Sequence, residues 1–480
     1  MSAQPFGDMD PEAFRDEAHR IADWIADYLA DPSRYPVLAR VAPGDIARAL
    51  PSEAPLQGEP FSRIFEDFER VILPGITHWN HPGFFAYFAI TGSAPGILAE
   101  FLSAALNVQA MLWRTSPAAT ELEEVTLAWL RRLVHLSDNF EGVIYDTASI
   151  STLHALAAAR ERAIPSVRSQ GLNAAGRFRI YCSDQAHSSI DKAVILLGFG
   201  HESLRKIPSD AAFRMRVDAL DDAVAEDRAN GETPLAVVAT VGTTSSTSRD
   251  PVSAIASVCE REGLWLHVDA AYAGVAAMVP GREDILDGAD RADSVVLNPH
   301  KWLFTPFDLS VLYTRHMDVV RAAFSLTPEY LKTAEAAVAR NLMDTGIQLG
   351  RRFRALKLWM VLRHFGADGL RARLAEHMRL ARLFGEWVDA APDFERMAPI
   401  PFSVVCFRAV PVELRGNETA IDELNSRLVD EVNRGGDIFV SHTRLNGHFV
   451  IRLAIGNLHT TEHHVRHAWS LVCKLLRRSG

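Results

Sequence analysis

The chain has 480 residues, of which 48% are hydrophobic and 23% are charged, and its formal net charge is −10 at pH 7. A chain of this length and composition can bury a large core, and it predicts two or three domains rather than one. The mildly acidic balance argues against nucleic acid or an anionic membrane surface as the main partner.

The first predicted element is an amphipathic helix over residues 11–31, which a proline-rich connector follows. Its apolar positions recur near helical spacing, and they are Phe14, Ile21, Trp24, Ile25, Tyr28 and Leu29. A helical arm of this size cannot form a core of its own. We therefore expect residues 1–93 to be an N-terminal arm that packs on a partner subunit.

Residues 94–360 are predicted to form a large domain, because short apolar runs alternate there with helical stretches. The predicted strands are 143–145, 178–182, 235–240, 264–268, 294–297 and 310–314. Predicted helices follow the first two of these strands, over 149–161 and 188–197. Strands that alternate with helices predict an α/β fold with a mostly parallel sheet and helices on both faces.

The remaining segment, 361–480, is predicted to be a smaller α+β domain. The pattern turns helical from about residue 350 and then alternates between strand and helix. The predicted helices are 351–365, 369–390, 418–434 and 462–476, and the predicted strands are 404–407, 438–441 and 449–455.

Two predicted strands of the large domain end next to residues that can carry chemistry. Asp269 follows the strand 264–268, and Lys301 lies just beyond the strand 294–297. Ligands of open α/β sheets bind outside the carboxyl ends of the strands. A lysine that holds pyridoxal 5′-phosphate (PLP) as an imine, and a carboxylate that keeps its pyridine nitrogen protonated, are what PLP chemistry requires. Taken singly, Asp269 also fits a helix cap and Lys301 a surface lysine, but their joint placement favours a PLP site.

Three further strand ends carry polar residues that are weaker signals. Residues 145–152 begin a helix with a cluster of hydroxyls, which is typical of a phosphate site and also of an ordinary N-cap. His187 lies at a strand-to-helix turn, where it can stack on an aromatic ring or cap the helix. Thr240 runs into the turn 242–244, which can place a hydroxyl near a cofactor or be a plain turn.

These motifs, in this order, resemble the group II PLP-dependent decarboxylases, and most closely the aromatic-L-amino-acid decarboxylases. The segment 298–302, with the letters NPHKW, is the most specific part of the resemblance, which runs from the N-terminal arm to 452–455. The family implies the PLP-dependent fold type I, the aspartate-aminotransferase-like fold, and a homodimer with a shared active site. It implies decarboxylation of tryptophan, phenylalanine, tyrosine or DOPA to the amine and CO₂.

The resemblance also implies a role for each matching residue. Lys301 forms the imine with PLP, Asp269 pairs with the pyridine nitrogen and His187 stacks over the ring. His300, beside the lysine, assists proton movement. Around the ring lie Thr240 and Ala271, and the phosphate is held by Ala148, Ser149 and Asn298.

On the substrate side, the segment 78–88 resembles the family's pocket segment. Trp79, Tyr87 and Phe88 are expected to wall the substrate ring, with Gln109 and Met111 of a second subunit completing the wall. Apolar walls favour a flat ring over a second carboxylate, which argues against glutamate as the substrate. The segment can equally be ordinary core.

One position departs from the family pattern. Counted back from Gly350, the place of the loop tyrosine that protonates the product is taken by Leu342, which has no proton to donate. Either another donor serves, such as Tyr330 or His300, or the protein is an aldehyde synthase that releases aldehyde, ammonia and peroxide. The retained His187 favours simple decarboxylation. Gly350 is a weak hint toward an indole substrate. A non-catalytic PLP-binding homologue is the third possibility, and intact Lys301 argues against it.

Several features predict no additional function. The four cysteines are far apart, with no CxxC pair, and predict reduced thiols in a cytoplasmic protein. The acidic N-terminus does not resemble a signal peptide, and no apolar run is long enough for a membrane span. A histidine cluster near the C-terminus suggests a solvated helix face rather than a metal site; it comprises His459, His463, His464 and His467.

Overall fold

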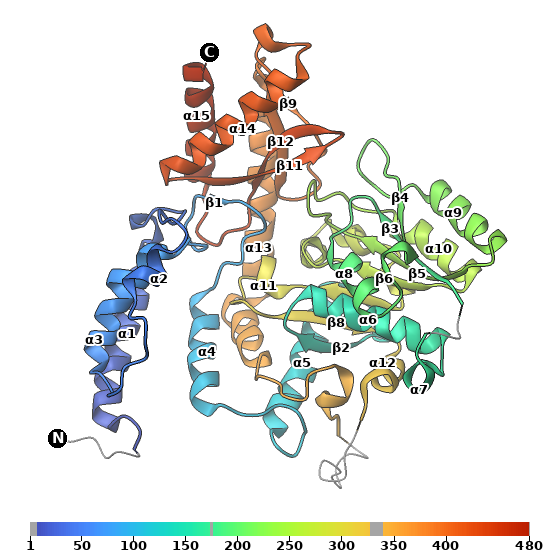
Figure 1. Cartoon of the computed structure of the whole chain (residues 1–480), viewed down its shortest axis with the longest axis horizontal. Coiled ribbons are helices and arrows are strands. Elements are labelled where there is room, and N and C mark those ends of the chain that lie inside the picture. The colour runs from blue at the N-terminus through green and yellow to red at the C-terminus, as the bar shows by residue number, and fades with distance from the viewer. Residues whose placement is uncertain (1–6, 173–175, 327–338, 480) are drawn as a thin grey trace.

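The computed structural model describes residues 7–172, 176–326 and 339–479 (Figure 1). A large sheet with helices on both faces forms one part, and a smaller sheet near the C-terminus forms the other. No helix in these ranges combines the length and apolarity needed to cross a bilayer.

The large sheet has seven strands in the order β2-β8-β7-β6-β5-β3-β4. Their bounds are β2 Glu141–Tyr145, β3 Phe178–Ser183, β4 Leu204–Ile207, β5 Thr233–Thr240, β6 Trp265–Asp269, β7 Ser294–Leu297 and β8 Ser310–Thr314. In this sheet β8 runs opposite to the other six strands, so the prediction of a mostly parallel sheet is confirmed. The sequence pattern missed β4, because this edge strand is only four residues long and carries two adjacent basic residues between its apolar ends. Among the described strands it pairs with β3 only.

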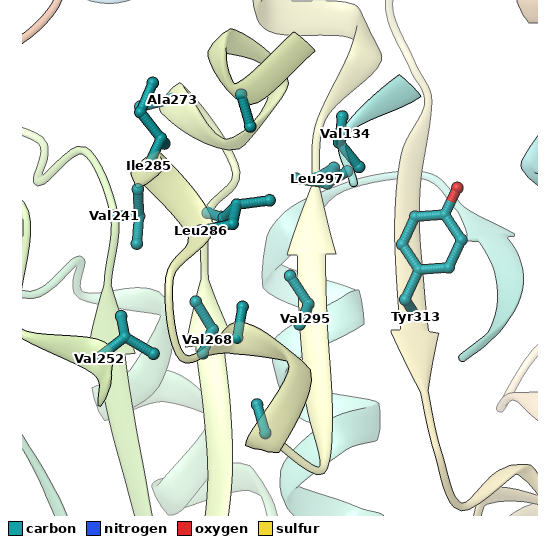
Figure 2. Packing of buried hydrophobic residues seen from close by; sticks show 14 of the residues in the cluster. Val134, Val241, Val252, Val268, Ala273, Ile285, Leu286, Val295, Leu297 and Tyr313 are labelled. Carbon is teal, nitrogen blue, oxygen red and sulfur yellow. The ribbon is translucent and has the colours of Figure 1, made fainter. Parts of the chain in front are cut away.

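Alternate residues of each strand enter two separate cores. Ala236 and Val238 of β5 pack in the core on one face, and Val237 and Ala239 pack in the core on the other. Figure 2 shows part of the second core, which contains Val268, Val295 and Tyr313 of the neighbouring strands β6, β7 and β8 together with Ile285 and Leu286. Strands that are buried on both faces read as continuous apolar runs, which is why the sequence identified them.

The helices that supply these cores come from the whole large domain. One face is covered by α6 Ala148–Ala163, α7 Val167–Gln170, α8 Ser189–Leu196 and α12 Met317–Phe324. The other is covered by α5 Pro117–Leu133, α9 Val217–Ala229, α10 Val252–Glu262 and the first part of α13 Ala355–Ala390. The short helix α11 Pro299–Trp302 follows β7 directly.

The smaller sheet has the strand order β1-β11-β12-β10-β9. Its strands are β1 Phe84–Phe85, β9 Phe394–Arg396, β10 Val404–Ala409, β11 Phe439–Leu445 and β12 His448–Ala454, and its helices are α14 Glu418–Gly435 and α15 Glu462–Ser479. The first strand, β1, comes from the predicted N-terminal arm and pairs in parallel with β11. Helix α13 crosses the predicted boundary at residue 360 and is broken at Gly366, where φ is +64°. The domain boundaries at 93 and 360 stay predictions.

The N-terminal helices α1 Pro11–Ala30, α2 Asp45–Ala49 and α3 Phe61–Asp67 lie apart from the large sheet (Figure 1). Helix α1 has no buried residue. Trp24 stacks on Tyr28 of the same helix and meets Phe65 of α3 edge-on. Helix α4 (Ala94–Leu106) also exposes apolar residues, namely Leu98, Phe101, Leu102 and Leu106. The chain thus leaves two apolar helical surfaces uncovered.

Candidate active site

A cavity of about 460 Å³ opens at the carboxyl ends of the parallel strands. It is bounded by the large sheet, by the segment that contains β1 and by strands β11 and β12. The predicted site residues that line it are Trp79, Tyr87, Phe88, Ala148, Ser149, His187, Thr240, Asp269, Ala271, Asn298, His300 and Lys301. Residues that lie far apart in the sequence therefore meet at one place.

Lys301 and Asp269 come from neighbouring strand ends. Asp269 is the last residue of β6, and Lys301 lies in α11, the helix that follows β7. Burial lowers the pKa of the Lys301 amine; the negative charge of Asp269 opposes this shift, and the positive charge of Arg452 adds to it. The amine lies 5.3 Å from the centre of the Phe88 ring. An amine with a lowered pKa is a better nucleophile near neutral pH.

His187 lies between β3 and α8, with its ring accessible from the cavity. The backbone N–H of Ser189 donates to its Nδ1 at 3.1 Å, and the Ser189 hydroxyl lies 2.9 Å from the same nitrogen. Burial lowers the pKa of His187, and the negative charge of Asp269 partly opposes this shift. The ring is thus held in one orientation by the first turn of α8.

The phosphate-site prediction falls on the N-terminus of α6. Ala148 and Ser149 are its first two residues, and the first N–H groups of a helix have no partner within it. Two polar side-chain atoms elsewhere in the cavity, Thr240 Oγ1 and Asn298 Oδ1, are buried and have no hydrogen-bond partner among the residues that the structure describes. Such atoms indicate a bound polar group.

The aromatic side of the cavity is held in place by stacking. Phe88 stacks on Tyr272 with ring centres 3.8 Å apart, and Tyr272 stacks on Trp302 at 4.7 Å. Trp79 stacks with Tyr87 at 6.0 Å. These rings give the cavity a wide apolar wall next to Lys301.

Sequence reasoning gave no site role to Arg452, which the structure places in the cavity lining. It is 4% exposed, and its guanidinium lies 4.6 Å from the centre of the Phe88 ring. It donates to the backbone carbonyls of Ser245 and Tyr87, and its Nη2 has no partner among the described residues. The signal in the sequence was a single charge inside the apolar strand 449–455. Ser441, His442 and Thr443 of β11 line the cavity as well, without any such signal.

The other predicted substrate residues form a separate group outside this cavity. The backbone N–H of Arg351 donates to Gln109 Oε1 at 2.6 Å, and that of Met343 donates to the Met111 carbonyl at 3.0 Å. A Cβ added at Gly350 would lie 3.2 Å from Gln109 Nε2. Leu342 begins the short helix η10 (Leu342–Thr345) and is 1% exposed. Tyr330 lies outside the described residues.

This second group is fastened to the large sheet by a buried ion pair. Arg351 Nη2 lies 3.0 Å from Glu123 Oε1 of α5 and donates to the Ile144 carbonyl of β2 at 2.6 Å. Glu123 also accepts the N–H of Ile144 at 2.9 Å. Next along β2, the Tyr145 hydroxyl donates to the Thr345 carbonyl. The segment after residue 340 is therefore fixed to the strand that leads into α6.

Among the described residues, no group of three or more His, Cys, Asp or Glu side chains is arranged to hold a metal ion. The C-terminal histidines make local contacts instead. His463 packs edge-on against His464, and the ring of His464 caps the backbone of Thr461.

Glu123→Ala should strongly destabilise the protein, because it leaves the buried Arg351 charge without its partner. We expect a loss of about 3–5 kcal/mol in the free energy of unfolding, measured by urea denaturation. The double variant Glu123→Leu/Arg351→Met should recover much of this loss, since it removes both charges. Glu12→Ala, which breaks an exposed pair with Arg15, is the control and should cost less than about 1 kcal/mol. Equal effects of Glu123→Ala and the control would contradict the anchoring role.

Comparison with known proteins gives one family model and similar proteins that are aligned over nearly the whole chain. A family model, the pyridoxal-dependent decarboxylase conserved domain, matches residues 43–410. Phenylacetaldehyde synthase of Arabidopsis thaliana is 41% identical over 474 residues, which cover 97% of this chain and 96% of that protein. Tyrosine decarboxylase 2 of the same organism is 41% identical over 480 residues, with coverages of 97% and 87%. The crystal structure of Oryza sativa TDC with PLP and tryptamine superposes with a TM-score of 0.95 at 36% identity, over 100% of both chains.

Proposed function

Because the chain belongs to the pyridoxal-dependent decarboxylase family, we propose that it removes the α-carboxyl group of an aromatic L-amino acid and releases the amine and CO₂. Its fold is the PLP-dependent fold type I, and its cofactor is PLP. One observation carries the substrate class: Lys301 and Asp269 open onto the same cavity as the aromatic wall of Trp79, Tyr87 and Phe88.

The residues of the cavity fit PLP. The N-terminus of α6 at Ala148 and Ser149 offers N–H donors and a partial positive charge to a phosphate group. Thr240 and Asn298 each bring a buried polar atom that lacks a partner within the described part of the chain. When bound, PLP supplies a ring that accepts the electron pair left by the departing carboxyl group.

In this proposal each side chain has a separate task. Lys301 would hold the cofactor as an imine, and its lowered pKa favours the neutral amine that this requires. Asp269 would keep a proton on the pyridine nitrogen. His187 would cover one face of the ring, because its Nδ1 is already engaged by Ser189.

Arg452 and the aromatic wall account for the recognition of an aromatic amino acid. The unpartnered Nη2 of Arg452 offers a positive charge to the α-carboxylate as substrate enters. Trp79, Tyr87 and Phe88 offer apolar surface to a flat side chain. The second carboxylate of a glutamate would be buried against these rings at a high cost in desolvation.

We propose that the active unit is a cytoplasmic homodimer. The exposed apolar face of α4 needs a cover, and the chain leading out of α4 carries Gln109 and Met111, which do not line the cavity of their own protomer. All four cysteines are free thiols, as expected in a reducing compartment. The dimer then allows Gln109 and Met111 to complete the wall of the partner's cavity.

A second candidate, an aromatic aldehyde synthase, is favoured by Leu342. Its side chain is apolar and buried, and it stands where a proton-donating tyrosine would be expected. Without such a donor, the carbanion formed as CO₂ leaves can react with dioxygen. The products would then be aldehyde, ammonia, CO₂ and peroxide in place of the amine.

The deciding experiment is product analysis by mass spectrometry, with peroxide followed in parallel. Purified protein with PLP is given L-tryptophan, L-tyrosine, L-phenylalanine, L-DOPA and L-glutamate in air. We expect amine and CO₂ from at least one aromatic substrate, with little peroxide and no product from glutamate. Aldehyde with matching peroxide would replace the proposed function by the second candidate. A protein that takes up no PLP would refute both.

Leu342→Tyr should lower the ratio of peroxide to amine, because a phenol can supply the proton that competes with dioxygen. Leu342→Phe is the matched control, since it has the same ring without the hydroxyl and should leave the ratio unchanged. Both ratios are measured with the best aromatic substrate. If the tyrosine variant behaves like the phenylalanine variant, position 342 does not control protonation.

The pH dependence of cofactor capture should follow the pKa of Lys301. The capture rate of the PLP-free protein should rise with pH as the amine loses its proton, and it should level off below pH 10.5, the ordinary value for lysine. Asp269→Asn removes a charge that raises this pKa, so its rate should level off at a lower pH still. Asp221→Asn, an exposed substitution on α9, should leave the profile unchanged. The rates are followed by absorbance, and a wild-type plateau at or above pH 10.5 would contradict this reading.

A further inference from the structure

The two polar residues before Lys301 are oriented by a backbone group. His300 and Asn298 are 3% and 1% exposed, and both line the cavity. The backbone N–H of Leu309 donates to His300 Nδ1 at 2.9 Å. A ring nitrogen that accepts a hydrogen bond holds its lone pair there and cannot carry a proton. The ring is therefore neutral, and its hydrogen lies on Nε2.

This tautomer conflicts with the amide next to it. His300 Nε2 lies 3.3 Å from Asn298 Nδ2, so two N–H donors face each other and no hydrogen bond can form. At the other end of the same amide, Asn298 Oδ1 is buried and has no partner in residues 7–172, 176–326 and 339–479. Rotating the Asn298 amide by half a turn resolves the conflict. Oδ1 then accepts from His300 Nε2–H, and the NH₂ group occupies the position where Oδ1 had no partner.

We propose that His300 is a positioning residue, which holds the Asn298 amide with its oxygen toward Nε2 and its NH₂ group toward the cofactor phosphate. This inference rests on the proposed function, because it assumes that PLP is the bound group. An NH₂ group there joins the N–H donors of Ala148 and Ser149 around the phosphate. The opposite orientation would set an amide oxygen against a phosphate oxygen, and the two would repel.

The surroundings of His300 fit a neutral ring that does not carry protons. Burial lowers its pKa to about 3, and the positive charge of Lys301 acts in the same direction. Asp308 opposes this shift, whereas Lys357 adds to it. Phe307 packs against the ring with centres 4.9 Å apart. In this proposal the Leu309 N–H orients the His300 ring, the ring orients the Asn298 amide, and the amide donates to the phosphate.

The test compares the affinity of the cofactor-free protein for PLP and for pyridoxal, which lacks the phosphate. His300→Leu should weaken PLP binding about ten- to a hundredfold, since a hydrogen bond to a charged group contributes about 1.5–3 kcal/mol. Pyridoxal binding should change less than about twofold. His300→Gln can accept from Leu309 and donate to Asn298, so it should retain most of the affinity for PLP. Asn298→Ala should match His300→Leu, and combining the two should add little.

Equal losses for PLP and pyridoxal in His300→Leu and Asn298→Ala would overturn the proposal, because the two residues would then support the cavity in general. Additive losses would overturn it too, since His300 would then act independently of Asn298. If His300→Leu does not fold, the proposal is still tested by His300→Gln, which should retain most of the affinity for PLP, and by Asn298→Ala, which should lose it. None of these measurements needs an amino-acid substrate. Phosphate-selective losses in a protein that forms no amine would refute the proposed function and leave the role of His300 standing.

Discussion

The site depends on one geometric constraint, the shared edge at which the parallel strands end. Thr240 is paired with Asp269 across β5 and β6, and Asp269 with Val296 across β6 and β7. Adjacent strands lie about 4.8 Å apart, so the strand ends of the PLP site are neighbours before any loop is considered. The two cores fix this register, because a slip of one residue would exchange the faces of every side chain.

Backbone groups then set the protonation pattern around the cofactor. His187 and His300 each use Nδ1 to accept a backbone N–H, from Ser189 and Leu309 respectively. Both rings therefore present Nε2–H as a donor when neutral. The two histidines make the same kind of backbone contact, but their surroundings differ. His187 remains accessible from the cavity, whereas His300 is buried beside Asn298.

The sequence predicted the parts of the site that depend on short, continuous segments. Strands buried on both faces appear as apolar runs, and the family motif at 298–302 identified the resemblance, which the comparisons confirm. Arg452 was missed because it belongs to the smaller sheet, and only the way this sheet faces the large one brings it into the cavity of Lys301. The tautomer of His300 could not be predicted from the sequence either, since it depends on a backbone N–H nine residues further along the chain.

The short strand β1 has a consequence for engineering this protein. It joins the aromatic wall to the smaller sheet: Phe84 pairs with Phe439, the Tyr87 N–H donates to Ser441, and Arg452 donates to the Tyr87 carbonyl. The wall is therefore supported from two sides, by β11 and β12 of the smaller sheet and by the stack of Phe88 on Tyr272 of the large domain. A chimera that borrows residues 78–88 from a relative to change substrate preference would need to borrow 438–455 with them.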